Sequence, residues 1–292
     1  MIGALVRELR PWQWPKNFFV LAGVVFAHQV NDPEQVVRAV AAMAAFCLLS
    51  SAGYVFNDLQ DIERDRIHPR KRRRPLAAGA IPIPLGWGLV AFLTVGGLGL
   101  SLLLGPAMGV LAASYLLLNL LYSLVLKQLV LLDVMAIAVG FVLRAVAGVE
   151  TLAPRPELSP WLLVCTFFLA LFIAVGKRRH ERVTLATEAE LHRSTLAEYP
   201  PELLDQLVSV VTGATILAYA IYTISPATSQ HVAGGRLVLT IPFVVYGVFR
   251  YLYLVYRRGR GGEPSELLFR DGPLLANVVL WGAAILGILY LG

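Results

Sequence analysis

The sequence predicts an all-α integral membrane protein built as a bundle of about nine transmembrane helices. Of its 292 residues, 57% are hydrophobic and only 15% are charged, whereas a soluble domain averages about 25% charged residues. The mean hydropathy is +0.68. Apolar stretches of about 20 residues, the length that crosses a bilayer, recur along the whole chain.

The nine apolar stretches define the expected helices, and the first of them is the weakest. Several contain Gly, Ala and Ser at helical spacings, which favours close helix packing in lipid. No soluble domain fits between them, so we expect residues 1–292 to form one transmembrane domain. Cys47 and Cys165 fall inside apolar stretches and are interpreted as packing residues. The stretches are 14–31, 36–56, 85–104, 107–126, 130–150, 160–177, 204–224, 236–256 and 273–291.

The lysines and arginines predict the orientation in the membrane. Twenty of the 25 lie on one side of the expected spans; Arg38, Arg155 and Arg236 lie on the other, and Arg144 and Arg250 lie within spans. This asymmetry predicts a plasma-membrane protein with a cytoplasmic N-terminus, a C-terminus outside and an active site facing the cytoplasm. It also explains the net charge of +6 without nucleic acid as a partner.

The segment from Asn57 to Asp65 carries the most informative pattern. Asp58, Asp61 and Asp65 are spaced i, i+3, i+7, so a helix would set all three carboxylates on one face. Three crowded anions repel one another unless a cation joins them, and Mg²⁺ takes carboxylate and phosphate oxygens. The pattern therefore predicts a Mg²⁺–diphosphate site. The alternative is a solvated acidic helix end followed by topology charges.

Basic residues near this segment are candidate phosphate ligands. The run from Arg70 to Arg74 follows it, and Arg73 and Arg74 are expected to order the loop over a diphosphate. Lys16 and Asn17 begin the first span, with Arg10 six residues earlier. The cationic side chains of Lys16 and Arg10 either reach a ligand phosphate or extend to the lipid headgroups.

Several segments together resemble the UbiA superfamily of intramembrane prenyltransferases. The N-D-x-x-D-x-x-x-D pattern of residues 57–65 is typical of the superfamily. Other segments are similar to its decaprenyl-phosphate phosphoribosyltransferase subgroup, and the resemblance spans nearly the whole chain. These segments are residues 10–17, 68–69, 73–79, 176–178 and 262–271.

The resemblance implies transfer of 5-phosphoribose from phosphoribosyl pyrophosphate to a polyprenyl (decaprenyl) phosphate, with release of pyrophosphate. It implies that Mg²⁺ sits among Asp58, Asp61 and Asp65, holds the leaving group and stabilises its growing charge, with Asn57 contributing to substrate binding. The product would be a precursor of arabinose-containing cell-envelope polymers.

One departure from the superfamily bears on the substrate. Aromatic prenyltransferases usually carry a second aspartate-rich motif after the sixth span, but here the sequence is Gly-Lys-Arg-Arg-His-Glu over residues 176–181. Lys177 and Arg178 fit a monophosphate ligand better than a second Mg²⁺–diphosphate site. They are otherwise topology charges at the end of a span.

Two other functions stay open. The first is a UbiA-type enzyme that joins a prenyl diphosphate to an aromatic or other acceptor. The second is a secondary transporter or scaffold in which the aspartates bind ions. A homo-oligomer also stays open.

Arg144 lies deep in a span, where a charge is costly and usually faces a cavity. A substrate phosphate or the carboxylate of Glu150 would be a suitable partner. Asp133 is expected to pair with Lys127 near the membrane surface.

Overall fold

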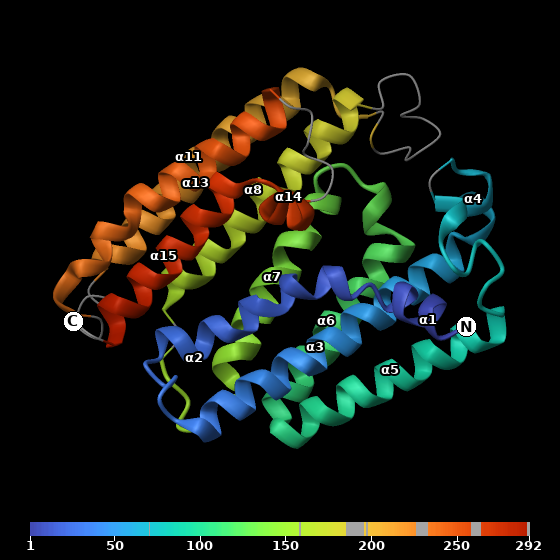
Figure 1. Cartoon of the computed structure of the whole chain (residues 1–292), viewed down its shortest axis with the longest axis horizontal. Helices are drawn as coiled ribbons and strands as arrows, with labels where there is room; N and C mark the ends of the chain where they lie inside the picture. Colours follow the sequence, from blue (N-terminus) through green and yellow to red (C-terminus); the bar gives the residue numbers. More distant parts are fainter. Residues whose placement is uncertain are drawn as a thin grey trace. The chain divides into compact units, whose positions relative to one another are not determined.

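The computed structural model describes residues 1–69, 71–157, 159–184, 196, 198–225, 233–257 and 264–290. Within those ranges every regular element is a helix (Figure 1), which confirms the predicted all-α class. Of the residues named in the sequence analysis, Arg70 and residues 262–263 lie outside the described residues.

The chain divides into two compact units. Unit 1 contains residues Met1–Val125 and Leu143–Pro156, and unit 2 contains Leu126–Val142 and Glu157–Gly292. The long helix α7 (Leu132–Glu150) contributes residues to both units.

In the described residues, the remaining elements of unit 1 are six α-helices and two 3₁₀-helices. They are α1 (Ile2–Leu9), η1 (Pro11–Leu21), α2 (Ala22–Phe26), α3 (Pro33–Gln60), α4 (Ile62–Ile67), η2 (Lys71–Arg73), α5 (Ile83–Leu104) and α6 (Pro106–Leu124).

In the described residues, the remaining elements of unit 2 are five α-helices and two 3₁₀-helices. They are η3 (Leu126–Gln128), α8 (Pro160–Thr184), α11 (Pro201–Ile224), η4 (Ala233–Thr240), α13 (Ile241–Arg257), α14 (Pro264–Arg270) and α15 (Gly272–Tyr290).

Eight helical segments of the described residues are long and apolar enough to cross a membrane. They correspond to the second through ninth predicted stretches. The first predicted stretch, 14–31, is helical only as far as Phe26, and there it consists of the 3₁₀-helix η1 followed by the short α2. Pro11 and Pro15 lie in η1, and a proline removes a backbone donor that a continuous α-helix needs.

Helix α3 is the centre of unit 1. It begins with Pro33 after Asp32, whose side chain accepts hydrogen bonds from the backbone N–H groups of Glu34 and Gln35. Phe46 and Leu49 of α3 are fully buried in a cluster with residues of η1, α6 and α7. An added Cβ at Gly97 of α5 would collide with the Leu49 side chain, so the glycine permits close packing of α3 and α5.

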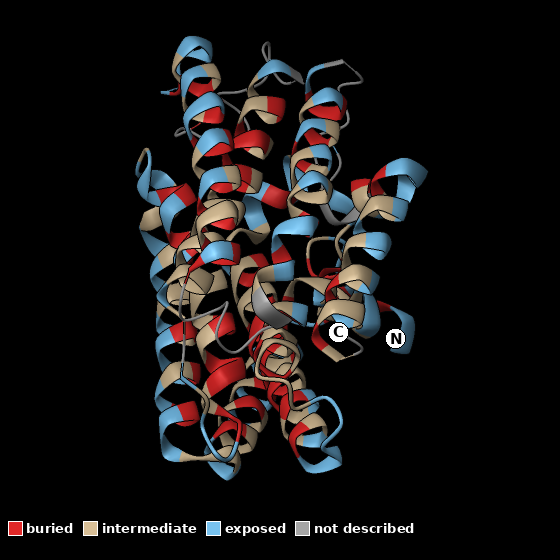
Figure 2. Ribbon diagram, turned by 90° about the vertical axis from the view of Figure 1, so that its left-hand side faces the viewer, coloured by how far each residue is buried: buried red, intermediate tan, exposed pale blue. Residues whose placement is uncertain are grey.

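Unit 2 has its own apolar core between α8, α11, α13 and α15. Phe172, Tyr251 and Leu254 are buried in one cluster, while Val175 and Leu204 belong to a second. The individual helices are therefore buried on one side and exposed on the other (Figure 2).

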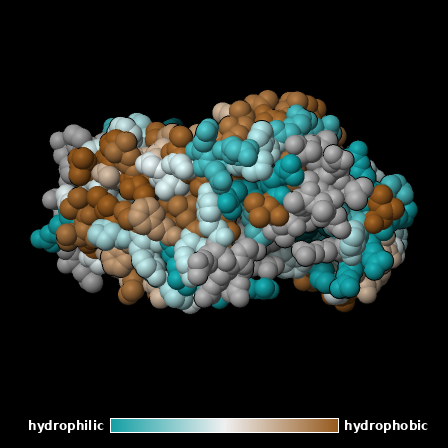
Figure 3. Space-filling view, turned by 90° about the horizontal axis from the view of Figure 1, so that it is seen from above, coloured by the Kyte–Doolittle hydropathy of each residue, from teal (hydrophilic) through white to brown (hydrophobic). Residues whose placement is uncertain are grey.

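Large apolar side chains cover much of the outer surface of both units. Phe92 and Leu103 of α5 are 73% and 85% exposed, and Val279 of α15 is 60% exposed. Figure 3 shows hydrophobic side chains gathered on the surface. Such an area is unusual for a soluble protein and fits a protein surrounded by lipid.

Both cysteines are free thiols, and Cys47 is buried in unit 1. This outcome agrees with their interpretation as packing residues.

Candidate functional site

The segment from Asn57 to Asp65 is not one continuous helix. Helix α3 ends at Gln60, Asp61 has φ −97° and ψ 10°, and α4 begins at Ile62. The expectation that three carboxylates share one helix face is therefore wrong. Asp58 and Asp65 are buried, whereas Asp61 is half-buried.

Asp58 and Asp65 are joined by arginines. Arg74 Nη1 lies 2.9 Å from Asp58 Oδ1 and 2.6 Å from Asp65 Oδ2. Arg10 Nη2 donates to both carboxylate oxygens of Asp58, at 2.7 and 2.5 Å. Lys71 Nζ lies 3.9 Å from Asp65 Oδ1. We call Arg10, Asp58, Asp65 and Arg74 the aspartate–arginine cluster.

Local backbone features bring these residues together. Arg10 follows α1 in the left-handed conformation, with φ 53°, which costs a residue with a side chain about 1–2 kcal/mol. This turn sends the chain from α1 into η1 and leaves Arg10 beside Asp58. At the other end, His68 has extended backbone angles and terminates α4, as expected of a residue before proline.

Glu8 of α1 is a residue of this region that the sequence analysis missed. It is 1% exposed, and neither carboxylate oxygen has a hydrogen-bond partner. The spacing in the sequence could have indicated this burial, because Glu8 follows the apolar Ala4 by about one helical turn and lies on the same, buried face of α1.

Burial changes the proton affinity of two carboxyl groups here. Burial and the neighbouring Asp58 carboxylate raise the pKa of Glu8 to about 7. Burial also raises the pKa of Asp65, although the Arg74 guanidinium opposes that effect. Both shifts reflect the cost of holding a charge away from water.

The donor groups fit Mg²⁺ only as part of a substrate complex. In the described residues, no group of three or more His, Cys, Asp or Glu side chains is arranged to hold a metal ion. However, Asp58 and Asp65 bring oxygens to a single cationic nitrogen, and Glu8 adds two buried oxygens without donors. Mg²⁺ is usually bound through one or two carboxylates together with substrate phosphates and water.

A second polar group of unit 1 surrounds Arg144. Its Nε lies 2.8 Å from Asn17 Oδ1 and its Nη2 lies 2.5 Å from the Tyr115 hydroxyl. The Asn17 amide in turn donates to Cys47 Sγ and Ser50 Oγ of α3. Ser50 precedes Asp58 by eight residues, which is about 12 Å along a helix.

Glu150, the carboxylate considered as a partner of Arg144, binds elsewhere. Its Oε1 lies 2.6 Å from Nη2 of Arg155. Arg144 donates instead to the neutral side chains of Asn17 and Tyr115, and Tyr115 is a partner that the sequence analysis missed.

Lys177 and Arg178 lie in unit 2, on α8. Arg178 is buried and donates from Nε to Asp133 Oδ2 at 2.7 Å and from Nη1 to Glu181 Oε2 at 2.6 Å. The Tyr199 hydroxyl donates to the other oxygen of Asp133 at 2.7 Å. The expected Asp133 partner was Lys127, and the structure pairs Asp133 with Arg178 instead because α8 packs beside the start of α7.

The other candidates occupy less constrained positions. Lys16 and Asn57 are half-buried, and Arg73 is exposed. Lys177 is half-buried, with Nζ 3.9 Å from Glu181 Oε1.

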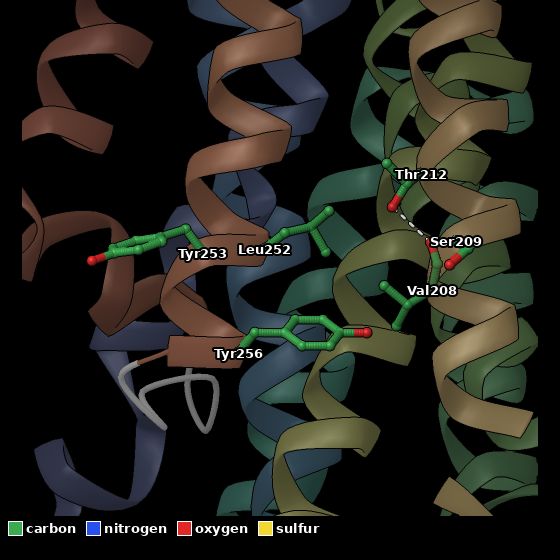
Figure 4. Close-up of a pocket in the computed structure, with 6 residues that line it drawn as sticks. All are labelled: Val208, Ser209, Thr212, Leu252, Tyr253 and Tyr256. Carbon is green, nitrogen blue, oxygen red and sulfur yellow. Dashed lines mark hydrogen bonds between the residues drawn. The ribbon is translucent and has the colours of Figure 1, made fainter. Parts of the chain in front are cut away.

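A shallow cavity of about 430 Å³ lies between α11 and α13 of unit 2 (Figure 4). None of the candidate residues lines it. Its walls are Val208, Ser209, Thr212, Leu252, Tyr253 and Tyr256.

Comparisons with known proteins identify similar chains. Residues 17–270 match the UbiA prenyltransferase family. A decaprenyl-phosphate phosphoribosyltransferase of Corynebacterium glutamicum is 32% identical, over 98% of this chain and 87% of that protein. The enzyme of the same name from Mycolicibacterium smegmatis is 31% identical, over 98% of this chain and 93% of its own length.

A solved structure has the same fold. The UbiA homologue from Archaeoglobus fulgidus bound to GPP and Mg²⁺ superposes with a TM-score of 0.73, covering 98% of this chain and 100% of that chain, at 19% identity. At this identity the likeness concerns the fold.

Proposed function

Because the chain belongs to the UbiA prenyltransferase family, and is therefore a membrane transferase, we propose that it transfers 5-phosphoribose from phosphoribosyl pyrophosphate to a polyprenyl phosphate such as decaprenyl phosphate. The observation that carries this proposal is the similarity to phosphoribosyltransferases over nearly the full length of both chains. The reaction would take place at the cytoplasmic face of the plasma membrane and would supply cell-envelope arabinose synthesis.

The bond changes are simple. An oxygen of the lipid phosphate forms a bond to C1 of the ribose, while the bond from C1 to the pyrophosphate oxygen breaks. The lipid phosphate is already anionic, so the reaction needs alignment and charge stabilisation more than a strong base. Pyrophosphate leaves with the bonding electrons.

The aspartate–arginine cluster supplies groups suited to the leaving group. Asp58 and Asp65, with Asp61 nearby in sequence, would hold Mg²⁺, which when bound neutralises negative charge that develops on pyrophosphate. Arg74 contacts both aspartates through a single nitrogen. Since a guanidinium carries five N–H donors, Arg74 and Arg10 are able to bind phosphate oxygens as well.

The remaining candidates are assigned less central roles. Lys16, Asn57 and Arg73 stay predictions as substrate-binding residues, and Lys177 stays a prediction as a monophosphate ligand. We assign Arg178 a structural role, because Asp133 and Glu181 already bind its guanidinium. Asn17 and Arg144 would contribute a positive, hydrogen-bonded wall inside the membrane.

The direct test uses purified protein in detergent with Mg²⁺, phosphoribosyl pyrophosphate and decaprenyl phosphate. We expect mass spectrometry of the lipid to show a gain of one phosphoribosyl unit, lost when EDTA removes the metal. No gain from folded protein, together with prenylation of an aromatic acid when a prenyl diphosphate is supplied, would establish the alternative enzyme activity instead.

A further inference from the structure

Glu8 is a buried carboxylate without a hydrogen-bond donor. It is 1% exposed, and neither Oε1 nor Oε2 has a hydrogen-bond partner. An ionised carboxylate buried without a partner costs several kcal/mol. A residue that is kept in such a position requires a compensating cation or proton.

The neighbouring cations are already bound to other carboxylates. Arg10 binds both oxygens of Asp58, and Arg74 bridges Asp58 and Asp65. The side chain of Glu8 interacts with that of Asp58. Two carboxyl groups side by side repel one another unless something positive lies between them.

We propose that Glu8 is a further ligand of the Mg²⁺ ion bound by Asp58, so that α1 contributes directly to the metal site. This inference rests on the proposed function of the aspartate–arginine cluster. The unpartnered oxygens of Glu8 and the carboxylate of Asp58 supply hard oxygen ligands, and phosphate and water complete the coordination.

The position of α1 supports this assignment. Ala4 is packed in an apolar cluster with Val55, Leu59 and Leu76, which holds α1 against the end of α3. Arg10, two residues after Glu8, binds Asp58. One short helix therefore brings a carboxylate and a guanidinium to the same aspartate.

The test measures metal binding, independently of turnover. Mn²⁺, a paramagnetic substitute for Mg²⁺, is titrated into the purified full-length protein with inorganic pyrophosphate, and free Mn²⁺ is followed by electron paramagnetic resonance. We expect Glu8→Gln to weaken Mn²⁺ binding by about 10- to 100-fold. Glu63→Gln is the matched control, because Glu63 is exposed and pairs with Arg66; its Mn²⁺ affinity should equal that of the wild type.

Glu8→Gln distinguishes two roles of Glu8: a carboxylate that binds the metal ion, and a protonated carboxyl group that donates a hydrogen bond to Asp58. Glutamine has nearly the shape of glutamic acid and can donate a hydrogen bond to Asp58, as a protonated Glu8 would. Unchanged Mn²⁺ affinity in Glu8→Gln would therefore overturn the proposal. Glu8→Asp provides a second variant that retains the carboxylate; binding by Glu8→Asp that exceeds binding by Glu8→Gln supports it.

Asp58→Asn shows whether only the role of Glu8 is wrong or whether the metal site at Asp58 is wrong as well. If Asp58→Asn loses Mn²⁺ affinity and Glu8→Gln does not, only the role of Glu8 is wrong. If neither substitution changes the affinity, the metal site at Asp58 is wrong, and the inference falls with it.

Discussion

At the scale of single residues, the buried carboxylates determine what the cluster can do. Asp58 is 2% exposed and receives hydrogen bonds from Arg10 and Arg74. Each guanidinium lowers the cost of burying that charge. The cluster is consequently both a structural junction and a candidate anion and metal site.

Asp58→Asn should lower turnover by about 100- to 1000-fold, because a neutral amide is a poor Mg²⁺ ligand and loses charge stabilisation in the transition state. Product formation with phosphoribosyl pyrophosphate and decaprenyl phosphate measures the effect. Size-exclusion chromatography checks that the variant is folded, and Glu63→Gln serves as the active control. Wild-type turnover in Asp58→Asn would remove Asp58 from the metal site.

Lys177→Ala should raise the KM for a phosphorylated substrate by about tenfold or more with little change in kcat, as expected when a charged hydrogen bond to the substrate is lost. Steady-state kinetics with each substrate varied in turn would reveal which phosphate is involved. Lys127→Ala, another lysine of unit 2, is the control. Identical KM values for both substrates in Lys177→Ala would leave Lys177 as a topology charge.

At the scale of elements, close backbone approach determines how η1 and α2 pack on α7. A Cβ added at Gly148 would overlap the carbonyl group of Val20, and one added at Gly23 would overlap the carbonyl group of Gly148. Only glycine permits this approach. The contact places Asn17 of η1 within reach of Arg144 on α7.

Gly148→Ala should destabilise the protein by about 1–3 kcal/mol, because the new methyl group forces the backbones of η1 and α7 apart. A lower thermal unfolding midpoint in detergent is the expected result. Gly213→Ala is the matched control: an added Cβ there meets nothing within 4 Å, and alanine favours a helix by about 1 kcal/mol over glycine. Equal midpoints for the two variants would contradict the packing argument.

At the scale of the whole molecule, the number of membrane crossings determines where the C-terminus lies. Eight segments are suitable spans, and the broken segment η1–α2 decides whether the total is odd or even. The apolar stretches predict nine crossings, and the asymmetry of lysine and arginine predicts a cytoplasmic N-terminus.

Alkaline phosphatase fused to the C-terminus should be active, because that enzyme folds only outside the cytoplasm, and a fluorescent protein fused there should be dark. A fusion after Arg74, in a loop predicted to be cytoplasmic, is the control with the opposite pattern. An inactive C-terminal phosphatase would mean that η1–α2 enters and leaves the membrane on one side.

Composition and local pattern were sufficient to predict the helical membrane fold. A bilayer excludes unpaired backbone groups, so an apolar stretch of sufficient length must form a helix. The same local logic identified Asp58, Asp65, Arg10 and Arg74 as candidates. It failed at Asp61, where the helix break between α3 and α4 could not be inferred from an uninterrupted acidic pattern.

The sequence by itself therefore determined the membrane class, the approximate spans and the kinds of chemical group available. Tertiary structure decided which groups meet. Arg10 binds Asp58 across 48 residues and Arg144 binds Asn17 across 127, and Glu8 is buried beside Asp58 because α1 packs against α3. Hydrophobic periodicity depends on near neighbours along the chain, whereas contacts between distant residues depend on how whole helices pack.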